Sequence, residues 1–148
     1  MAGKKKKSTT RSATNLESLS DHTFFLDRAL QSYSLREALK DLGALVEVHR
    51  DHFAEAADDI DWLPEISRRN WVILSKDQFN WLERQAIANA KGRAFLLTQG
   101  SLSGDEQVSI ICGAMPGILR ILKTTPAPFI ARIHRTRRVV LMPREFRR

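Results

Sequence analysis

The sequence contains a single cysteine and no apolar run long enough to cross a membrane. Cys112 is alone among 148 residues, so it has no partner for an intrachain disulfide, which agrees with a reducing compartment. Every apolar stretch falls short of the ~20 residues that a membrane span needs. The lysines at residues 4–7 are not followed by an apolar segment, so a secretory signal is not indicated. We therefore expect a cytoplasmic protein with no membrane segment.

The common nucleotide-binding and hydrolase motifs are missing as well. No Gly-x-Gly-x-x-Gly follows a predicted strand, and no Gly-Lys-Ser/Thr is present to bind a phosphate. The GSLSG stretch at residues 100–104 is not a nucleophile elbow between a strand and a helix. His49 and His52 have the spacing of a metal-binding pair, but no third soft ligand lies at a helpful spacing, so a polar loop is favoured. These absences argue against dinucleotide-binding proteins, P-loop NTPases and serine hydrolases.

Charge is distributed unevenly along a chain of otherwise ordinary composition. With 43% apolar and 28% charged residues, the sequence is typical of one globular domain. Residues 1–20 carry five Lys/Arg and one Glu, residues 21–130 carry twelve Lys/Arg and fifteen Asp/Glu, and residues 131–148 carry seven Arg and one Glu. An acidic body with basic ends suits a nuclease, which needs carboxylates for cations and separate cationic groups for phosphates; a solubilising tail is the alternative for the N-terminal end.

Apolar runs alternate with helical patterns along the chain. This alternation predicts a mainly parallel sheet with helices on both faces, a three-layer α/β/α sandwich. We expect a basic N-terminal arm at residues 1–20, the folded domain at 21–134 and a basic C-terminal extension at 135–148. The expected strands are residues 23–27, 44–48, 71–75, 93–98, 129–133 and 139–142, and the expected helices are residues 34–42, 58–69, 79–90 and 104–123.

Two aspartates stand directly after predicted strands, and a third stands near the start of a predicted helix. If the strand order begins 2-1-3-4, the first and third strands are neighbours about 5 Å apart, and their carboxyl ends bring Asp27 and Asp77 side by side. The helix before the third strand starts at the same edge, where Asp61 can join them. Glu65 or Glu83 could supply a fourth oxygen.

An all-oxygen site of this kind suits Mg²⁺ or Mn²⁺, which accept phosphates as further ligands and support phosphodiester hydrolysis. Other interpretations are weaker. Asp58 or Asp59 is expected to cap the helix rather than bind a metal. A phosphoacceptor role for Asp27 lacks a second aspartate two positions later. The three tryptophans have the spacing of core residues rather than of a base-stacking surface.

Six short stretches together resemble the PIN-like domain of VapC-type toxins. The stretches read TFFLDR (23–28), DHF (51–53), DIDWLPE (59–65), WVILSKD (71–77), RAFL (93–96) and PFIA (128–131), and the resemblance covers roughly residues 23 to 133. The resemblance implies an α/β/α fold, a Mg²⁺- or Mn²⁺-dependent ribonuclease, an antitoxin as partner, and in many relatives a homodimer. It also implies Asp27, Asp61 and Asp77 as the catalytic and metal-binding acids.

The sequence departs from this family at two positions. Ser75 stands where related sequences commonly have Thr, and Phe79 stands where they commonly have a further acid. Ser75 can still hydrogen-bond a carboxylate from beside the metal site. For RNA binding we expect Arg28, Lys76 and the basic residues Arg135, Arg137 and Arg138. The alternative is a non-catalytic nucleic-acid or partner-binding module of the same fold.

Overall fold

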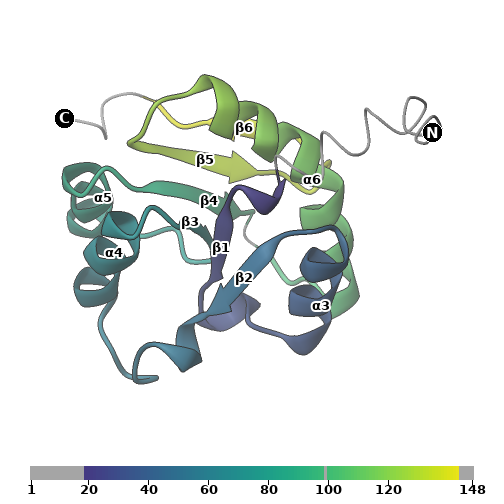
Figure 1. Ribbon diagram of the computed structural model, residues 1–148, viewed down its shortest axis with the longest axis horizontal. Helices are drawn as coiled ribbons and strands as arrows, with labels where there is room; N and C mark the ends of the chain where they lie inside the picture. The colour runs from purple at the N-terminus through teal and green to yellow at the C-terminus, as the bar shows by residue number, and fades with distance from the viewer. Residues whose placement is uncertain (1–18, 99, 144–148) are drawn as a thin grey trace, which may run out of the picture.

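The computed structural model describes residues 19–98 and 100–143. At its centre is a six-stranded sheet with the order β2-β1-β3-β4-β5-β6 (Figure 1). The first five strands run parallel, and β6 pairs antiparallel with β5. The strands are β1 (Thr23–Leu26), β2 (Leu45–Val48), β3 (Val72–Ser75), β4 (Arg93–Leu97), β5 (Phe129–Ile133) and β6 (Val139–Leu141). The mainly parallel sheet and the order of its first four strands were predicted, and both are confirmed.

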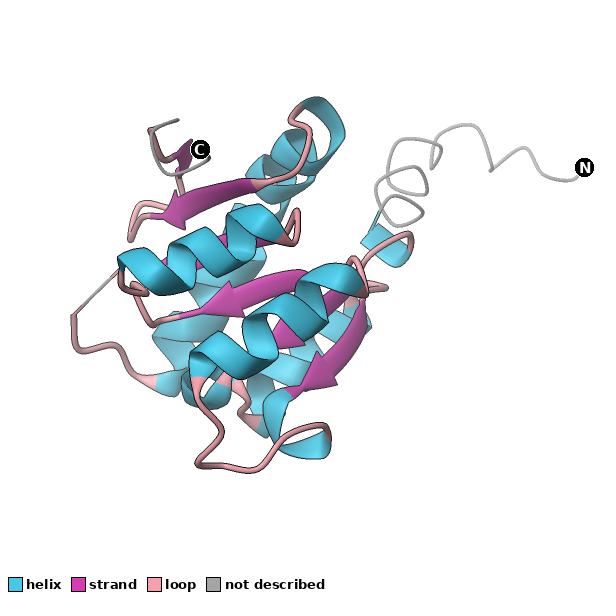
Figure 2. Cartoon of the chain, turned by 90° about the vertical axis from the view of Figure 1, so that its left-hand side faces the viewer, coloured by secondary structure: helices cyan, strands magenta, loops and turns pink. Residues whose placement is uncertain are grey.

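Helices cover the two faces of the sheet, which confirms the three-layer sandwich. In Figure 1, α4 and α5 lie on one side of the strands, and α3 and α6 lie on the other. Figure 2 shows α4 and α5 in front of the sheet. The helices are α3 (Tyr33–Asp41), α4 (Asp59–Arg68), α5 (Trp81–Asn89) and α6 (Gly104–Thr124), with short 3-10 turns η1 (Arg28–Leu30) and η2 (His49–Asp51).

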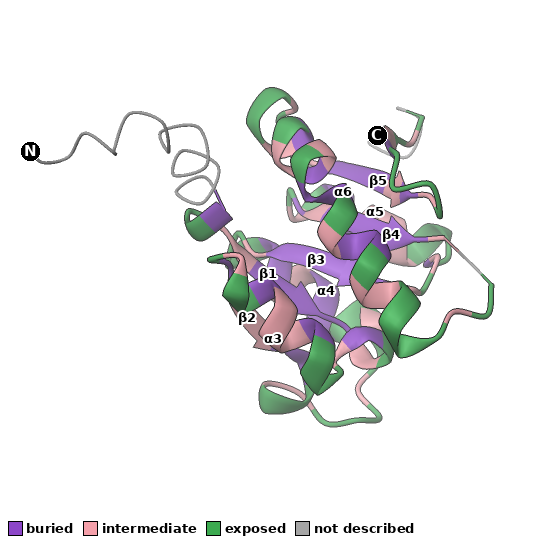
Figure 3. Ribbon diagram, turned by 90° about the vertical axis from the view of Figure 1, so that its right-hand side faces the viewer, coloured by how far each residue is buried: buried purple, intermediate pink, exposed green. Residues whose placement is uncertain are grey.

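The alternation of side chains along each strand divides the core into two clusters. Phe24 and Leu26 of β1 face α3 and α6, while Phe25 between them packs with Trp62 and Leu63 of α4. Because both faces are covered, the central strands are apolar at successive positions rather than at every second one. Figure 3 shows β1, β3, β4 and β5 as a largely buried band between the helices.

Polar residues fix where the helices begin. Ser32, Asn80 and Ser103 each accept a hydrogen bond from a backbone N–H three residues on, and the last two form reciprocal capping boxes with Glu83 and Glu106. Asp58 occupies the N-cap position of α4 but forms no side-chain cap. α6 is a single helix from Gly104 to Thr124 and includes Pro116.

The folded part differs slightly from the domain limits that we expected. Leu19, which we assigned to the N-terminal arm, is 3% exposed and packs in the core; the arm before it lies outside the described residues. The strand β6, inside our C-terminal extension, belongs to the sheet. None of the helices in the described ranges combines the length and apolar character needed to span a membrane.

Candidate metal centre

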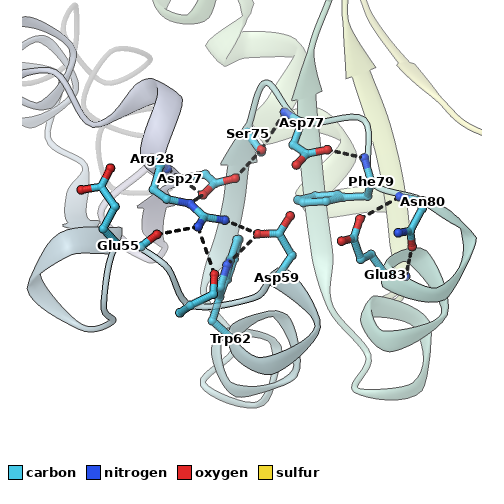
Figure 4. A network of polar contacts seen from close by, with 11 residues as sticks. Asp27, Arg28, Glu55, Asp59, Trp62, Ser75, Asp77, Phe79, Asn80 and Glu83 are labelled. Carbon is cyan, nitrogen blue, oxygen red and sulfur yellow. Dashed lines mark hydrogen bonds and ion pairs between the residues drawn. The ribbon is translucent and has the colours of Figure 1, made fainter.

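The predicted neighbours Asp27 and Asp77 lie at the carboxyl edge of the sheet, at the ends of β1 and β3. Leu26 pairs with Leu74 in the parallel register, and the Asp27 N–H donates to the Leu74 carbonyl at 3.0 Å. Figure 4 shows the Asp27 and Asp77 carboxylates at this edge, on either side of Ser75. The topology thus delivers both acids to one place, as the strand order predicted.

Ser75 links the two aspartates. Its side chain is fully buried, and its hydroxyl donates to Asp27 Oδ2 at 2.7 Å while accepting the Asp77 N–H at 2.9 Å. The role that we expected for Ser75, a hydrogen bond to a site carboxylate, is confirmed. The other oxygen of Asp27, Oδ1, accepts the Arg28 N–H at 2.6 Å. Asp27 itself is 4% exposed, so its position is tightly fixed.

Phe79, which replaces an acid at this position, has a structural role. Its ring is 5% exposed and meets Trp62 edge-on, with 6.3 Å between ring centroids. Its backbone has φ of 55°, a conformation uncommon for a bulky residue. The Phe79 N–H donates to Asp77 Oδ1 at 2.9 Å and so orients that carboxylate. Phe79 therefore contributes a buried ring that packs beside the site and a backbone hydrogen-bond donor, instead of a metal ligand.

The third aspartate of the site is Asp59, the first residue of α4. Its side chain is 9% exposed, and Oδ1 accepts from Trp62 Nε1 at 2.9 Å and from the Arg28 guanidinium. Figure 4 shows its carboxylate directed at Asp77 and Glu83. Asp59, Asp77 and Glu83 each offer an oxygen, and the three oxygens lie within 4.8 Å of one another. We refer to these three residues as the carboxylate trio.

The structure does not bring Asp61 or Glu65 to this site, in contrast to our prediction. Asp61 is exposed, and Glu65 forms ion pairs with Arg68 and Arg69 on the surface of α4. The reason is the helix period of 3.6 residues, which turns Asp61 about 200° away from Asp59. The sequence already indicates which aspartate faces inward. Asp59 lies on the same face of the helix as the buried residues Trp62, Leu63 and Ile66, whereas Asp61 does not.

The electrostatics of the site suit a divalent cation. The pKa of Asp59 is raised to about 6, first by desolvation and then by the facing carboxyl groups of Asp77 and Asp27. Oxygens around one Mg²⁺ lie about 2.1 Å from the ion and so about 3–4 Å from one another, close to the spacing of the carboxylate trio. An all-carboxylate donor set selects a hard ion of this type. The residues present therefore fit Mg²⁺ or Mn²⁺.

An open pocket of about 410 Å³ adjoins the site. Its lining includes the charged residues Arg28, Asp59 and Glu83 and the apolar residues Ile60 and Leu82. Ile60 is 43% exposed and Leu82 is 64% exposed. The carboxylates thus face a cavity that a substrate can enter from solvent.

The basic residues predicted to bind RNA differ in their contacts with the rest of the protein. Arg28 and Arg137 are engaged within the protein: Arg28 binds the site and its neighbouring loop, and Arg137 donates to the Ser109 carbonyl at 3.2 Å and to the Ser109 hydroxyl at 2.6 Å. Lys76 and Arg135 contact backbone carbonyls of residues 100 and 101, both at 3.3 Å, near the carboxyl edge. Arg138 is exposed.

The two histidines occupy different environments. His49 is fully buried among Phe25, Phe53 and Trp62, and neither of its ring nitrogens has a hydrogen-bond partner among the described residues. Burial, and secondarily the charge of Arg28, lowers its pKa. His52 contacts Glu47 at 2.7 Å. The expectation of a polar loop is therefore wrong for His49, which belongs to the core.

Comparison with known proteins supplies independent information on this site. The family described as "PIN like domain" matches residues 23–99, a range that includes Asp27, Asp59, Asp77 and Glu83. A protein of Mycobacterium tuberculosis (strain ATCC 25618 / H37Rv) named "Putative ribonuclease VapC45" is 24% identical over 121 residues. That alignment covers 77% of this chain and 86% of the relative. No solved structure matches the chain.

Proposed function

This chain belongs to the PIN-like domain family, and we propose that it is a VapC-type, Mg²⁺- or Mn²⁺-dependent endoribonuclease that hydrolyses RNA phosphodiester bonds. The single observation that carries the proposal is the carboxylate trio, which gathers Asp59, Asp77 and Glu83 within 4.8 Å at the mouth of an open pocket. Family membership alone would leave open whether a working set of acids is present. The trio supports the presence of that set.

The residues of the site have two kinds of role: some would bind the ion, and others hold those ligands in position. Asp59, Asp77 and Glu83 would hold the ion, and Asp27 lies beside them, where it accepts hydrogen bonds from Arg28 and Ser75. A bound Mg²⁺ or Mn²⁺ supplies neutralisation of the phosphate and activation of a water for in-line attack. Ser75 fixes Asp27 through its hydroxyl, and the Phe79 N–H fixes Asp77. This division differs from our expectation from sequence, in which Asp61 took the place of Asp59.

The RNA would approach along the carboxyl edge of the sheet. The parallel strands β1, β3, β4 and β5 all end at this edge, so the acids after β1 and β3 share it with Lys76 and with the turn after β5 that contains Arg135 and Arg138. Neighbouring strands are about 5 Å apart, which places the basic turn about 10 Å from β3. We propose that Lys76, Arg135 and Arg138 contact phosphates beside the cleavage site.

The similarity to a protein named as a VapC ribonuclease also suggests a biological setting. We propose that the ribonuclease is the toxin of a toxin-antitoxin pair and that a cognate antitoxin protein restrains it. The exposed apolar side chains of Ile60, Trp81 and Leu82 beside the acidic pocket offer a surface for such a partner. A homodimer is the further assembly that the family suggests.

The proposal is tested by incubating the purified protein with mixed RNA, with Mn²⁺ and with EDTA in its place. We expect cleavage that requires the metal and that is lost in Asp77→Asn and Asp59→Asn. Asp61→Asn is the matched control, because Asp61 lies on the same helix two residues away and faces solvent. It should retain cleavage close to that of the unmodified protein.

The outcomes of this experiment separate the proposal from its rival. Cleavage that survives both Asp77→Asn and Asp59→Asn would show that a contaminant or another site is responsible. Salt-sensitive RNA binding without any cleavage in Mn²⁺ would instead favour a non-catalytic binding module.

A further inference from the structure

Arg28 is the most heavily engaged side chain at the site, although an arginine beside a cation site is electrostatically unfavourable. One guanidinium nitrogen donates to the carbonyls of Glu55 and Ala57, at 2.8 and 3.0 Å. The other terminal nitrogen donates to Asp59 Oδ1, and Nε lies 3.6 Å from Asp27 Oδ1. Figure 4 shows the guanidinium between the carboxylates of Asp27 and Asp59. Arg28 therefore bridges these two aspartates.

The four acids of the site are consequently divided into two parts. Asp59 turns one oxygen to the guanidinium and remains able to face Asp77 and Glu83 in the carboxylate trio. Asp27 lies on the other side of the guanidinium, and both of its oxygens already accept hydrogen bonds, from the Arg28 N–H and from Ser75. The position between Asp27 and Asp59, where a second ion would need to bind, is thus filled by a positively charged group.

Two divalent ions are a common arrangement for phosphodiester hydrolysis, and they lie about 4 Å apart between shared carboxylates. Here Asp59 is the carboxylate that two ions would share. A guanidinium has a fixed single charge and rigid planar donors, and two backbone carbonyls hold this one in place. An incoming ion would have to break these contacts to displace it.

We propose that Arg28 replaces a second metal ion, so that the site binds one divalent cation, at Asp59, Asp77 and Glu83. Arg28 is then a positioning residue: it neutralises Asp27 and one side of Asp59 and ties the loop before α4 to the site. This inference rests on the proposed function, because it concerns the same cation site. It goes further in specifying how many ions the site takes and which residue sets that number.

Titration of the metal-free protein with Mn²⁺ alone tests the inference without any measurement of activity. Isothermal titration calorimetry or the electron paramagnetic resonance signal of free Mn²⁺ gives the number of bound ions per chain. We expect one ion for the unmodified protein and two for Arg28→Gln, because the uncharged side chain leaves Asp27 and Asp59 available. Arg28→Lys, which keeps the charge, should restore a stoichiometry of one.

The alternative results distinguish the two proposals. Two ions bound by the unmodified protein would overturn the role of Arg28 while leaving a metal-dependent nuclease in place, and this result does not depend on the folding of any variant. A single ion in a folded Arg28→Gln protein would also overturn it. Loss of all Mn²⁺ binding in the unmodified protein would instead contradict the proposed function. A purely structural role for Arg28 would change thermal stability but not the number of ions.

Discussion

Asp59 and Asp61 are two residues apart on α4, and the structure gives them opposite environments. The side chain of Asp59 is 9% exposed and faces two other carboxyl groups, whereas Asp61 is exposed to solvent. The two residues therefore form a matched pair for mutagenesis. Replacing either one by Asn removes the same charge, but only the replacement at Asp59 alters the site.

We predict that stability without metal depends on the protonation of Asp59. Its folded pKa of about 6 lies above that of the unfolded chain, so the folded protein binds this proton more tightly and loses stability as pH rises from about 4 through 6. Burial and the facing carboxyl groups, which raise the pKa of Asp59, outweigh the hydrogen bond from Trp62, which lowers it. Asp59→Asn should reduce this pH-dependent loss of stability by about 1 kcal/mol. A fully buried carboxyl group would give a larger effect, but solvent reaches the pocket beside Asp59.

Urea denaturation in EDTA at pH 4.5 and pH 8 measures this difference for Asp59→Asn and, as the control, for Asp61→Asn. The control should keep the pH dependence of the unmodified protein. An unchanged pH dependence in Asp59→Asn would contradict the raised pKa.

His49 should give stability the opposite pH dependence. Burial lowers its pKa, so the folded protein keeps the ring neutral while the unfolded chain takes up a proton below about 6.5. The free energy of unfolding should therefore fall as pH decreases below that value. His49→Phe removes two buried nitrogens without partners among the described residues, and it should reduce the loss between pH 8 and pH 5 by on the order of 1 kcal/mol. Denaturation curves of the two proteins at both pH values measure the effect; equal losses would contradict it.

At the scale of elements, Arg137 fastens the turn between β5 and β6 to α6. Its side chain lies over Gly113, and an added Cβ at Gly113 would overlap Arg137 Cδ and Nε. The guanidinium reaches Ser109 one turn earlier on the helix. The absence of a side chain at Gly113 is therefore what lets the turn approach the helix.

We predict that Gly113→Ala is destabilising although alanine favours helices. The gain in helix propensity is about 1 kcal/mol, but displacing Arg137 loses its two contacts with Ser109 at about 1 kcal/mol each. In the Arg137→Ala background, where the overlap and both contacts with Ser109 are already absent, Gly113→Ala should instead stabilise the protein by about 1 kcal/mol, the gain in helix propensity. Thermal denaturation of the single and double variants completes the cycle.

Gly104→Ala is the matched control for this cycle, because nothing lies within 4 Å of a Cβ at that position of α6. It should be neutral or slightly stabilising. Additive effects of Gly113→Ala and Arg137→Ala would show that the two residues do not interact.

The elements could be predicted from sequence because each strand and helix carries a strong local pattern. Strand runs such as VILS at Val72–Ser75 alternate with helical patterns, and this alternation determines a parallel sheet. Which face of α4 is directed at the site was harder to predict. Our prediction used only the position of Asp61 near the start of the helix and did not use the helical period. Trp81 shows a similar difficulty: we expected a core residue, but it is the first residue of α5 and is 68% exposed.

The site depended on tertiary contacts that local patterns do not contain. Asp27, Asp77 and Glu83 were predicted candidates, and the structure brings them to one edge. The bridge from Arg28 to Asp59, however, joins residues 31 positions apart through a loop without periodic pattern. For the same reason the burial of His49 was missed, because its aromatic neighbours come from β1, α4 and the loop after η2.

On the scale of the whole molecule, the formal charge of +7 arises largely outside the described residues. Residues 1–18 and 144–148 together hold eight of the 24 Lys/Arg and two of the 17 Asp/Glu. The limits of the fold set where trimming is safe, because Leu19 is buried and β6 ends at Leu141.

We predict that a chain of residues 19–143 still folds and cleaves RNA but binds it more weakly. Each phosphate contact that is lost should lower the slope of log affinity against log salt by about 0.7 for a single strand. Fluorescence anisotropy with labelled RNA in EDTA, at several salt concentrations, measures affinity separately from cleavage. An unchanged slope would show that the basic ends do not contact RNA, and loss of all cleavage would indicate that they are required for more than attraction.

Glu83 has two roles that share one carboxylate group. One of its oxygens accepts the Asn80 N–H at 2.8 Å and so closes the first turn of α5, while its carboxylate also belongs to the carboxylate trio. We therefore expect ion binding to affect the capping of this helix. Occupancy of the site would change how often the start of α5 opens, and hydrogen exchange at the Asn80 amide would report on the metal from within the backbone.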